Sequence, residues 1–239
     1  MTADISFRSD VTVELVKHSA GDADVLWAAR VSTKGEQSLD DVNADADKSA
    51  GLINYLMRDR HGSPFEHSVF TFFVQAPIFM WREHFRHRIA SYNEESGRYK
   101  VLEPMFYVPG PERKLVQVGK PGAYDFIDGT SEQFDLVTEQ TKHACIVAYE
   151  SYQSMLDAGV AREVARIVLP VTIYSSAYVT MNARALMNFL SLRRKAEGSH
   201  FPSFPQREIE MVAEKYEEEF QKLMPLTHAA FVSNGRVAP

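Results

Sequence analysis

A polar cluster between Arg86 and Tyr99 holds the residue types best suited to binding a phosphorylated ligand. Its fourteen residues include three arginines, one histidine, one asparagine, two glutamates and two serines. Arginine presents a rigid fork of N–H donors that matches phosphate and carboxylate oxygens. Asparagine, serine and glutamate can hydrogen-bond to ring edges and sugar hydroxyls. Because the residues just before Arg86 are mostly apolar, the cluster is predicted to line a pocket rather than a solvated helix face.

Two later arginines lie among apolar residues. Arg166 is flanked by Val164 and Leu169, and a buried guanidinium needs an anionic partner. An internal carboxylate and a ligand phosphate both remain open as that partner. Arg193 lies eleven residues after Asn182, nearly in register with it along an apolar helix stripe. It is the second candidate for a buried functional arginine.

Four histidines raise the alternative of a metal site: His61, His67, His84 and His87. His84 and His87 are one helical turn apart, and Glu66 is close in sequence to the other two. No His-Glu-x-x-His arrangement is present, however, and the nearby arginines would repel a divalent cation. We therefore predict no metal site.

Composition limits the classes of function. The 239 residues are 45% hydrophobic and 24% charged, as expected for a globular chain that can bury a large core. A net charge of −6 argues against a nucleic-acid partner. No signal-peptide pattern or membrane-length apolar run is present, so we expect a cytoplasmic protein with no membrane partner. The single cysteine, Cys145, lies in an apolar helical run and is predicted to be a core residue, not a nucleophile.

Hydrophobic periodicity predicts the elements that must position these residues. Strands are predicted at 10–18, 69–75, 105–108, 115–118 and 171–179. Helices are predicted at 22–30 (capped by Asp22 or Asp24), 50–59, 132–156, 161–169, 182–195 and 206–223. A further helix is predicted from Pro77 to about Ile89, with loops at 32–47 and 119–129. No repeat or composition break appears, which favours one α+β domain over residues 1–239.

The spacing inside the polar cluster resembles a family signature. Arg86-His87-Arg88, seven further residues and then Ser96 match the signature of the flavin-dependent thymidylate synthases, and Arg98 follows. Blocks at 61–67, 165–170 and 182–193 resemble further blocks of that family in the same order. A short motif alone is weak evidence, but an ordered set of blocks is specific.

This resemblance implies an FAD enzyme that methylates dUMP to dTMP. It implies 5,10-methylenetetrahydrofolate as the carbon donor and NADPH as the reductant. It also implies a mixed fold peculiar to the family, and a homotetramer whose active sites lie between subunits. In such an enzyme the flavin performs the hydride chemistry, while the protein contributes alignment and charge.

The resemblance also assigns residues. The flavin contacts that it implies are Ser63, Arg86, His87, Arg88, Glu94, Asn182, Arg184 and Asn188. The dUMP contacts that it implies are Glu83, His84, Phe85, Arg86, Glu94, Glu95, Ser96, Gly97, Arg98, Arg166 and Arg193. Arg98 and Arg166 suit the phosphate, and Ser96 resembles a serine beside the reactive ring. Arg193 resembles the arginine that binds the uracil and favours ionisation at its N3, where a permanently charged guanidinium stabilises negative charge.

The sequence departs from the family pattern in two places. Glu83 stands where glutamine is common, and segment 196–205, which contains His200, is longer than the usual link. A nucleotide-binding regulatory protein that kept the pocket and lost the chemistry is the alternative from a different class, and a histidine-based metallohydrolase is a more distant one. No motif residue is missing, which favours the enzyme.

Overall fold

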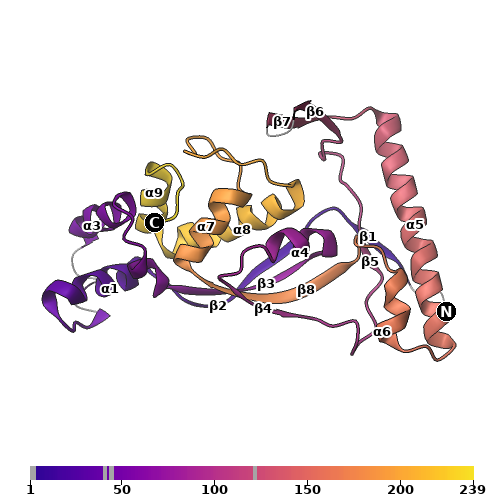
Figure 1. Cartoon of the computed structure of the whole chain (residues 1–239), viewed down its shortest axis with the longest axis horizontal. Helices are drawn as coiled ribbons and strands as arrows, with labels where there is room; N and C mark the ends of the chain where they lie inside the picture. The colour runs from indigo at the N-terminus through magenta and orange to yellow at the C-terminus, as the bar shows by residue number, and fades with distance from the viewer. Residues whose placement is uncertain (1–3, 40–41, 43–45, 121–122) are drawn as a thin grey trace. The chain divides into compact units, whose positions relative to one another are not determined.

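The structure is a computed structural model that describes residues 4–39, 42, 46–120 and 123–239. Its strands are β1 (Ser6–Arg8), β2 (Thr12–Ser19), β3 (Val69–Pro77), β4 (Ser91–Glu94), β5 (Met105–Tyr107), β6 (Val116–Lys120), β7 (Ala123–Ile127) and β8 (Tyr174–Asn182). Its helices are α1 (Asp22–Lys34), α3 (Ala46–Arg58), α4 (Ile78–His84), α5 (Ser131–Asp157), α6 (Arg162–Ala165), α7 (Ala183–Arg193), α8 (Arg207–Leu223) and α9 (Pro225–Ser233), with 3₁₀ turns η1 (Ser63–Glu66) and η2 (Arg166–Val168) (Figure 1). This mixture of helices and strands confirms the predicted α+β class.

The chain divides into two compact units, each assembled from separate stretches of sequence. Unit 1 comprises Met1–Val11, Gln75–His84 and Glu94–Ala177. Unit 2 comprises Thr12–Val74, Phe85–Asn93 and Tyr178–Pro239. Strands β3, β4 and β8 each pass from one unit into the other. The single family domain over residues 1–239 stays a prediction.

Three sheets organise the strands. The largest has the order β2-β3-β8-β4, so β3 and β8 are its central strands. In β3 the side chains of Phe70, Phe72 and Val74 are buried and alternate with less buried neighbours, which is the period of two expected for a strand. Strands β1 and β5 pair in parallel, and β6 pairs antiparallel with β7.

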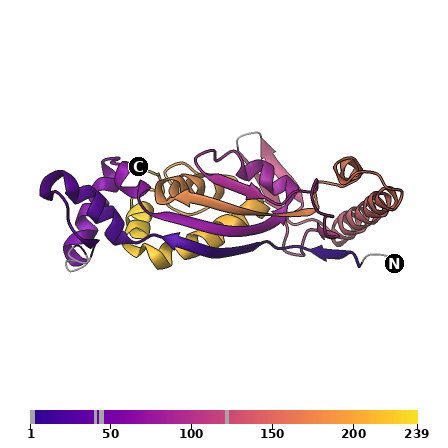
Figure 2. The ribbon, with the colours of Figure 1, turned by 90° about the horizontal axis from the view of Figure 1, so that it is seen from below.

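Aromatic packing holds the core of unit 2. The ring of Phe72 on β3 lies 4.2 Å from the ring of Tyr216 on α8, and Phe189 on α7 lies 5.4 Å from the same tyrosine. All three side chains are fully buried. Helices α7 and α8 therefore pack together against one face of the strands (Figure 1, Figure 2). This packing fixes the orientation of α7, which carries Asn182 at its N-terminus and Arg193 at its end.

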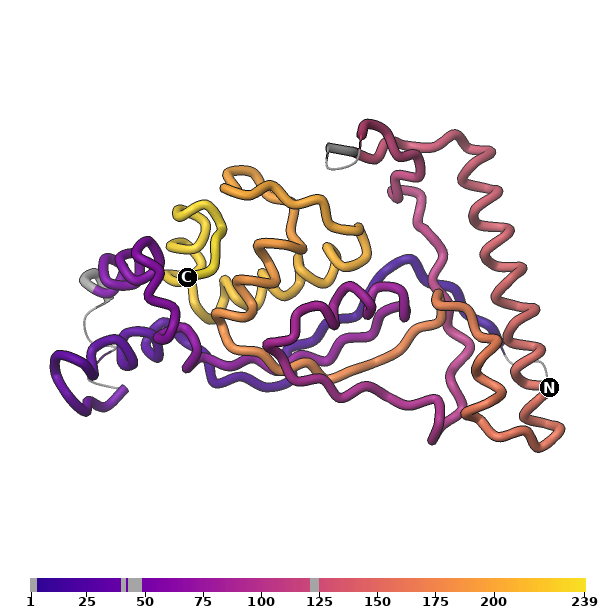
Figure 3. The backbone as a smooth tube through the Cα atoms, in the orientation of Figure 1, coloured from indigo at the N-terminus to yellow at the C-terminus, as the bar shows by residue number. Residues whose placement is uncertain are grey.

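Helix α5 holds the core of unit 1. It begins at a capping box, in which Thr130 and Gln133 each accept a hydrogen bond from the other's backbone N–H. Buried Cys145, Tyr149 and Tyr152 face the core, and the Tyr149 hydroxyl donates to the Leu102 carbonyl over 3.1 Å. After α5 the chain turns back along it through α6 and η2, as the tube in Figure 3 shows. Arg166 lies at the junction of α6 and η2.

The predicted helix from Pro77 to Ile89 is wrong in its second half. Pro77 closes β3, and α4 ends at His84. Phe85 and Ile89, which the predicted helix includes, are 39% and 75% exposed. Beyond α4, Phe85 packs edge-on against Tyr92, and the Tyr92 hydroxyl donates to the His87 carbonyl. These contacts draw the chain into β4 instead of a longer helix.

Other differences have local causes. Helix α1 is capped by Gly21, because Asp22 accepts hydrogen bonds from Leu226 and Thr227, and Asp24 accepts one from Ser68. The predicted loop at 119–129 contains β7, which pairs with β6 as a hairpin. The predicted loop at 32–47 begins inside α1 and ends inside α3, and residues 40–41 and 43–45 lie outside the described part of the chain. Helix α9 was not predicted.

Every helix in the described ranges is too short or too polar to span a bilayer.

Candidate active site

The signature residues divide between the two units. Arg86, His87 and Arg88 belong to unit 2, together with Arg193, whereas the stretch from Glu94 to Arg98 belongs to unit 1 with Arg166. The two groups are described separately. We call them the phosphate cluster (Ser96, Gly97, Arg98, Glu163 and Arg166) and the α7 cluster (Gly62, Ser63, Glu66, Arg86, His87, Arg88, Asn182, Arg184, Asn188, Phe189 and Arg193).

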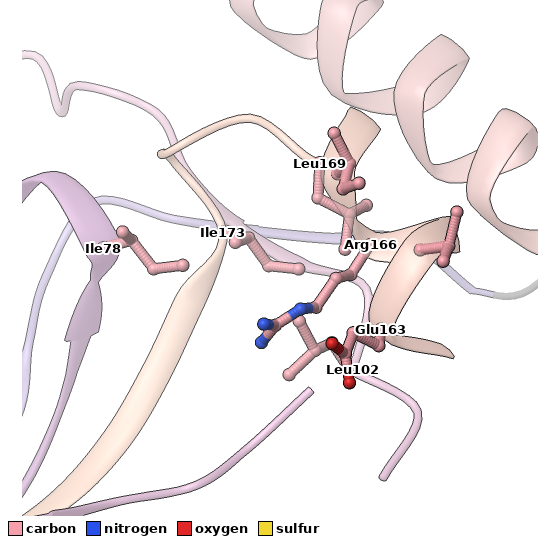
Figure 4. A pocket seen from close by; sticks show the side chains of 8 residues that line it. Ile78, Leu102, Glu163, Arg166, Leu169 and Ile173 are labelled. Carbon is pink, nitrogen blue, oxygen red and sulfur yellow. The ribbon is translucent and has the colours of Figure 1, made fainter. Parts of the chain in front are cut away.

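Unit 1 contains a pocket of about 520 Å³ beside the phosphate cluster. Six of its lining residues are apolar, and the two charged ones are Glu163 and Arg166. Figure 4 shows the Arg166 side chain extending into the space bounded by Ile173 and Leu102. Apolar walls reduce the screening of a charge, so this guanidinium attracts an anion more strongly than a fully solvated one would.

Arg166 has no hydrogen-bonding or ionic partner for its side chain among the described residues. The sequence left an internal carboxylate and a ligand phosphate open as its partner, and no such carboxylate contacts it in the described part of the chain. The Arg166 side chain passes close to Gly97, where an added Cβ would lie 3.2 Å from the Arg166 Cδ and 3.0 Å from Leu102. Gly97 is therefore the residue that lets this arginine pass close to the backbone of the signature.

Arg98 is anchored to the wall of the same pocket. Its Nε donates to Oε2 of Glu163 over 2.7 Å, and both side chains are about half exposed. The contact uses the Nε of the guanidinium, whose Cζ also lies 5.8 Å from the centre of the Tyr99 ring. Glu163 was not among the predicted site residues, although it lines the pocket and pairs with Arg98. It precedes Arg166 by three positions and so shares its helix face, which is the signal that could have revealed it.

The glutamates of the signature hold its backbone in place. Glu94 accepts a hydrogen bond from the Ser175 hydroxyl over 2.6 Å. Glu95 accepts one from the Ser176 N–H on β8 and another from Lys100. The Ser96 hydroxyl accepts the Arg98 N–H over 3.3 Å inside the turn that follows. These contacts fix Ser96 and Arg98 relative to β8.

Arg193 and His87 form the centre of the α7 cluster. The Arg193 Nε donates to the His87 Nε2 over 3.0 Å, and the His87 ring packs 4.6 Å from the Phe189 ring. Burial, together with the charge of Arg193, lowers the pKa of His87 from 6.5 to about 4. His87 is therefore neutral at physiological pH. The contact orients the Arg193 guanidinium without cancelling its charge.

Arg184 connects α7 to η1 at the other end of the helix. It donates to Glu66 and to the Pro239 carbonyl, each over 2.6 Å. Its guanidinium lies directly over Gly62, where an added Cβ would come within 2.5 Å of the Arg184 Cζ. Asn182 caps α7 by accepting the Ala185 N–H over 2.9 Å. Glycine at position 62 thus allows Arg184 to cover the turn that carries Ser63.

Several predicted flavin contacts remain available for a ligand. The side chains of Ser63, Arg86, Arg88 and Asn188 are exposed and have no hydrogen-bonding or ionic partner in the described part of the chain. Two of them, Arg86 and Arg88, are permanently charged guanidiniums that can bind an anionic group.

The remaining predicted residues lie in different surroundings. His84 is fully buried in unit 1, where its ring lies 5.4 Å from Trp81, and Glu83 is half-buried. No group of three or more histidine, cysteine, aspartate or glutamate side chains able to hold a metal ion occurs among the described residues. Cys145 is buried, as predicted, and burial raises the pKa of its thiol.

Comparison with known proteins identifies the family. A family model described as "Thymidylate synthase complementing protein" (Thy1) matches residues 14–226. A flavin-dependent thymidylate synthase from Streptomyces avermitilis is 67% identical over 235 residues, which cover 98% of this chain and 96% of the relative. The corresponding protein of Streptomyces coelicolor is 64% identical over 236 residues, with coverage of 98% and 96%.

Solved structures of one further protein are also similar to this chain. The UMP/dUMP methylase PolB from Streptomyces cacaoi, bound with 5-Br dUMP, is 54% identical and has a TM-score of 0.92, covering 98% of this chain and 100% of that one. The complex of the same methylase with 5-Br UMP gives 53% identity and a TM-score of 0.90.

The chain therefore belongs to the flavin-dependent thymidylate synthase (Thy1) family. The predictions of the family and of a methyltransferase enzyme are confirmed, and the relatives carry the name of an enzyme rather than of a regulatory protein.

Proposed function

We propose that this protein methylates dUMP to dTMP, with FAD as its flavin, 5,10-methylenetetrahydrofolate as the carbon donor and NADPH as the reductant. The methylene group passes from the folate nitrogens to C5 of the pyrimidine, C5 loses its proton, and a hydride that originates on NADPH reduces the methylene group to a methyl group. Tetrahydrofolate and NADP⁺ are the other products. No thiolate takes part, since Cys145 is buried and burial raises its pKa.

The observation that carries the proposal is the guanidinium of Arg166, which extends into the pocket of unit 1 and has no hydrogen-bonding or ionic partner among the described residues. A nucleoside monophosphate ends in a phosphate, and arginine binds phosphate through two parallel N–H···O bonds. Arg166 and the terminal N–H groups of Arg98 would hold that phosphate. Support comes from the similar solved structure of PolB, which was bound with 5-Br dUMP.

The proposed role of Arg193 follows from its charge. A fixed positive charge beside the uracil stabilises the ring in the form ionised at N3, whose electron-rich C5 can attack the methylene carbon. Neutral His87 orients this guanidinium through its Nε2. We propose that Ser96, held in its turn by the Arg98 N–H, lies beside the reactive ring. Glu83, His84, Phe85, Glu95 and Gly97 complete the proposed nucleotide site.

The α7 cluster fits a flavin by the chemistry of its donors. A dinucleotide cofactor carries a negatively charged pyrophosphate, and Arg86 and Arg88 offer two guanidiniums without partners in the described part of the chain. Ser63 and Asn188 add neutral hydrogen-bonding groups. Asn182, Arg184, His87 and Glu94 complete the proposed set. When bound, the flavin supplies the hydride relay between NADPH and the methylene group.

A homotetramer with active sites between subunits is part of the proposal, and the resemblance to the family is what supports it. The visible absorption spectrum of the purified protein tests the cofactor assignment. We expect flavin bands that bleach when NADPH and dUMP are added without oxygen. A colourless protein that takes up no added FAD would contradict the proposal.

A second substrate is favoured by one observation. The similar solved chain is named a UMP/dUMP methylase and was bound with 5-Br UMP as well as with the deoxy form. The same assay with UMP tests whether this chain also accepts a ribonucleotide. Formation of 5-methyl-UMP would establish it, and dTMP formation without any 5-methyl-UMP would exclude it.

A further inference from the structure

We propose that Glu163 determines how many phosphates the nucleotide can carry, so that the pocket of unit 1 favours a monophosphate over a diphosphate or triphosphate. This inference rests on the proposed function, since it concerns the same nucleotide. It assigns a role in specificity to a residue outside the family signature.

The contacts of Glu163 place a negative charge in the phosphate cluster. Its carboxylate lines the pocket with Arg166 and accepts the Nε–H of Arg98 over 2.7 Å. The other lining residues are apolar and carry no charge. Two guanidiniums and one carboxylate therefore leave a single net positive charge for the ligand.

This charge suits a monophosphate. A phosphate monoester carries about −1.5 to −2 charges near neutral pH. Every further phosphate brings more negative charge, which must enter a region where the Glu163 carboxylate already offsets one of the two cations. Repulsion from that carboxylate therefore increases with the length of the phosphate chain. Since Glu163 is 57% exposed, dissolved salt should weaken the repulsion.

The opposing view is that Glu163 merely forms a surface ion pair that holds Arg98. In that case its charge would affect all nucleotides equally. The Glu163→Gln variant separates the two views, because glutamine keeps an oxygen that can accept the Arg98 Nε–H and removes only the charge. Glu163→Met is a second uncharged variant, and it lacks that oxygen.

The test measures binding of dUMP, dUDP and dUTP to the flavin-loaded protein by calorimetry. In E163Q we expect the ratio of the dUTP Kd to the dUMP Kd to fall by about fivefold at low salt, the order of magnitude for removing one nearby charge. This change should shrink at high salt. In E163M the ratio should fall similarly even if all three nucleotides bind more weakly. Glu103→Gln is the matched control. Glu103, like Glu163, pairs with a cation, in its case Lys100 at 3.8 Å, but it does not line the pocket.

An unchanged ratio in E163Q and E163M would overturn the inference, as would an equal change in E103Q. A wild-type protein that binds none of the three nucleotides would instead count against the proposed function itself. The two failures are therefore distinguishable in one set of titrations.

Discussion

The Nε of Arg193, at the end of α7, donates a hydrogen bond to the Nε2 of His87 over 3.0 Å. The histidine can accept because its pKa is lowered to about 4, which keeps the ring neutral. A residue of the signature and a residue more than a hundred positions later thus form one unit, in which a fixed cation is oriented by a neutral partner. In our proposal this cation faces the uracil.

Replacing Arg193 by alanine should abolish dTMP formation while the protein stays folded and yellow. Loss of one preorganised electrostatic contact typically lowers kcat by a factor of about 10² to 10³. Turnover and the flavin spectrum measure the two properties. Arg194→Ala is the matched control, because Arg194 forms ion pairs with Glu210 and Glu214. It should lower the melting temperature and leave turnover per folded molecule unchanged. Undiminished turnover in R193A would exclude the proposed role.

Acid should weaken the fold through His87. In the unfolded chain this histidine takes up a proton near pH 6.5, whereas in the folded protein it does so only near pH 4. Between these values the unfolded state binds more protons, so the free energy of unfolding falls as the pH falls from 6.5 to 4. His87→Gln keeps an acceptor oxygen but cannot titrate. Its melting temperature should therefore fall less than that of the wild type over this range, and parallel curves would contradict the prediction.

Arg166→Ala should weaken dUMP binding by roughly tenfold to a hundredfold, the usual cost of losing a hydrogen bond to a charged group. Folding should be nearly unaffected, because Arg166 has no side-chain partner in the described ranges that would be left behind. Calorimetric titration with dUMP measures the change. Arg162→Ala, in the adjoining helix α6 but outside the pocket lining, should bind dUMP like the wild type. Equal affinities for R166A and wild type would place the phosphate elsewhere.

Gly62→Ala should lower the affinity for FAD. It should have a smaller effect on the free energy of unfolding. The new Cβ would lie 2.5 Å from the Arg184 Cζ, so the flexible arginine must leave its position over Gly62 and Glu66. Titration of flavin-free protein with FAD measures the affinity. Gly51→Ala is the control, since nothing lies within 4 Å of its Cβ and the residue is in helix α3. It should raise the unfolding free energy by about 0.5–1 kcal/mol and leave FAD binding unchanged.

The sequence predicted those elements whose local pattern agrees with their tertiary environment. Helix α5 carries a capping box and a long amphipathic pattern, and β3 alternates with a period of two. The prediction that α4 continues to Ile89 was wrong. The apolar spacing continues through Phe85 and Ile89, but Phe85 packs against Tyr92 on the strand that follows α4. Periodicity does not reveal such a contact.

The candidate site residues follow from the sequence motifs, whereas their side-chain partners do not. Arg166 and Arg193 were identified because charges on apolar stripes are unusual. Glu163 was missed because its partner, Arg98, is 65 residues away in the sequence. The sequence also could not predict that His87 is neutral, since its pKa depends on burial and on a cation 106 positions later.

The most direct test of the account is a dTMP assay with the purified, flavin-loaded protein supplied with dUMP, 5,10-methylenetetrahydrofolate and NADPH. We predict that dTMP forms, that omitting any one of the three abolishes it, and that tetrahydrofolate appears in equal amount. Oxidation of NADPH and binding of dUMP without any dTMP would contradict the account.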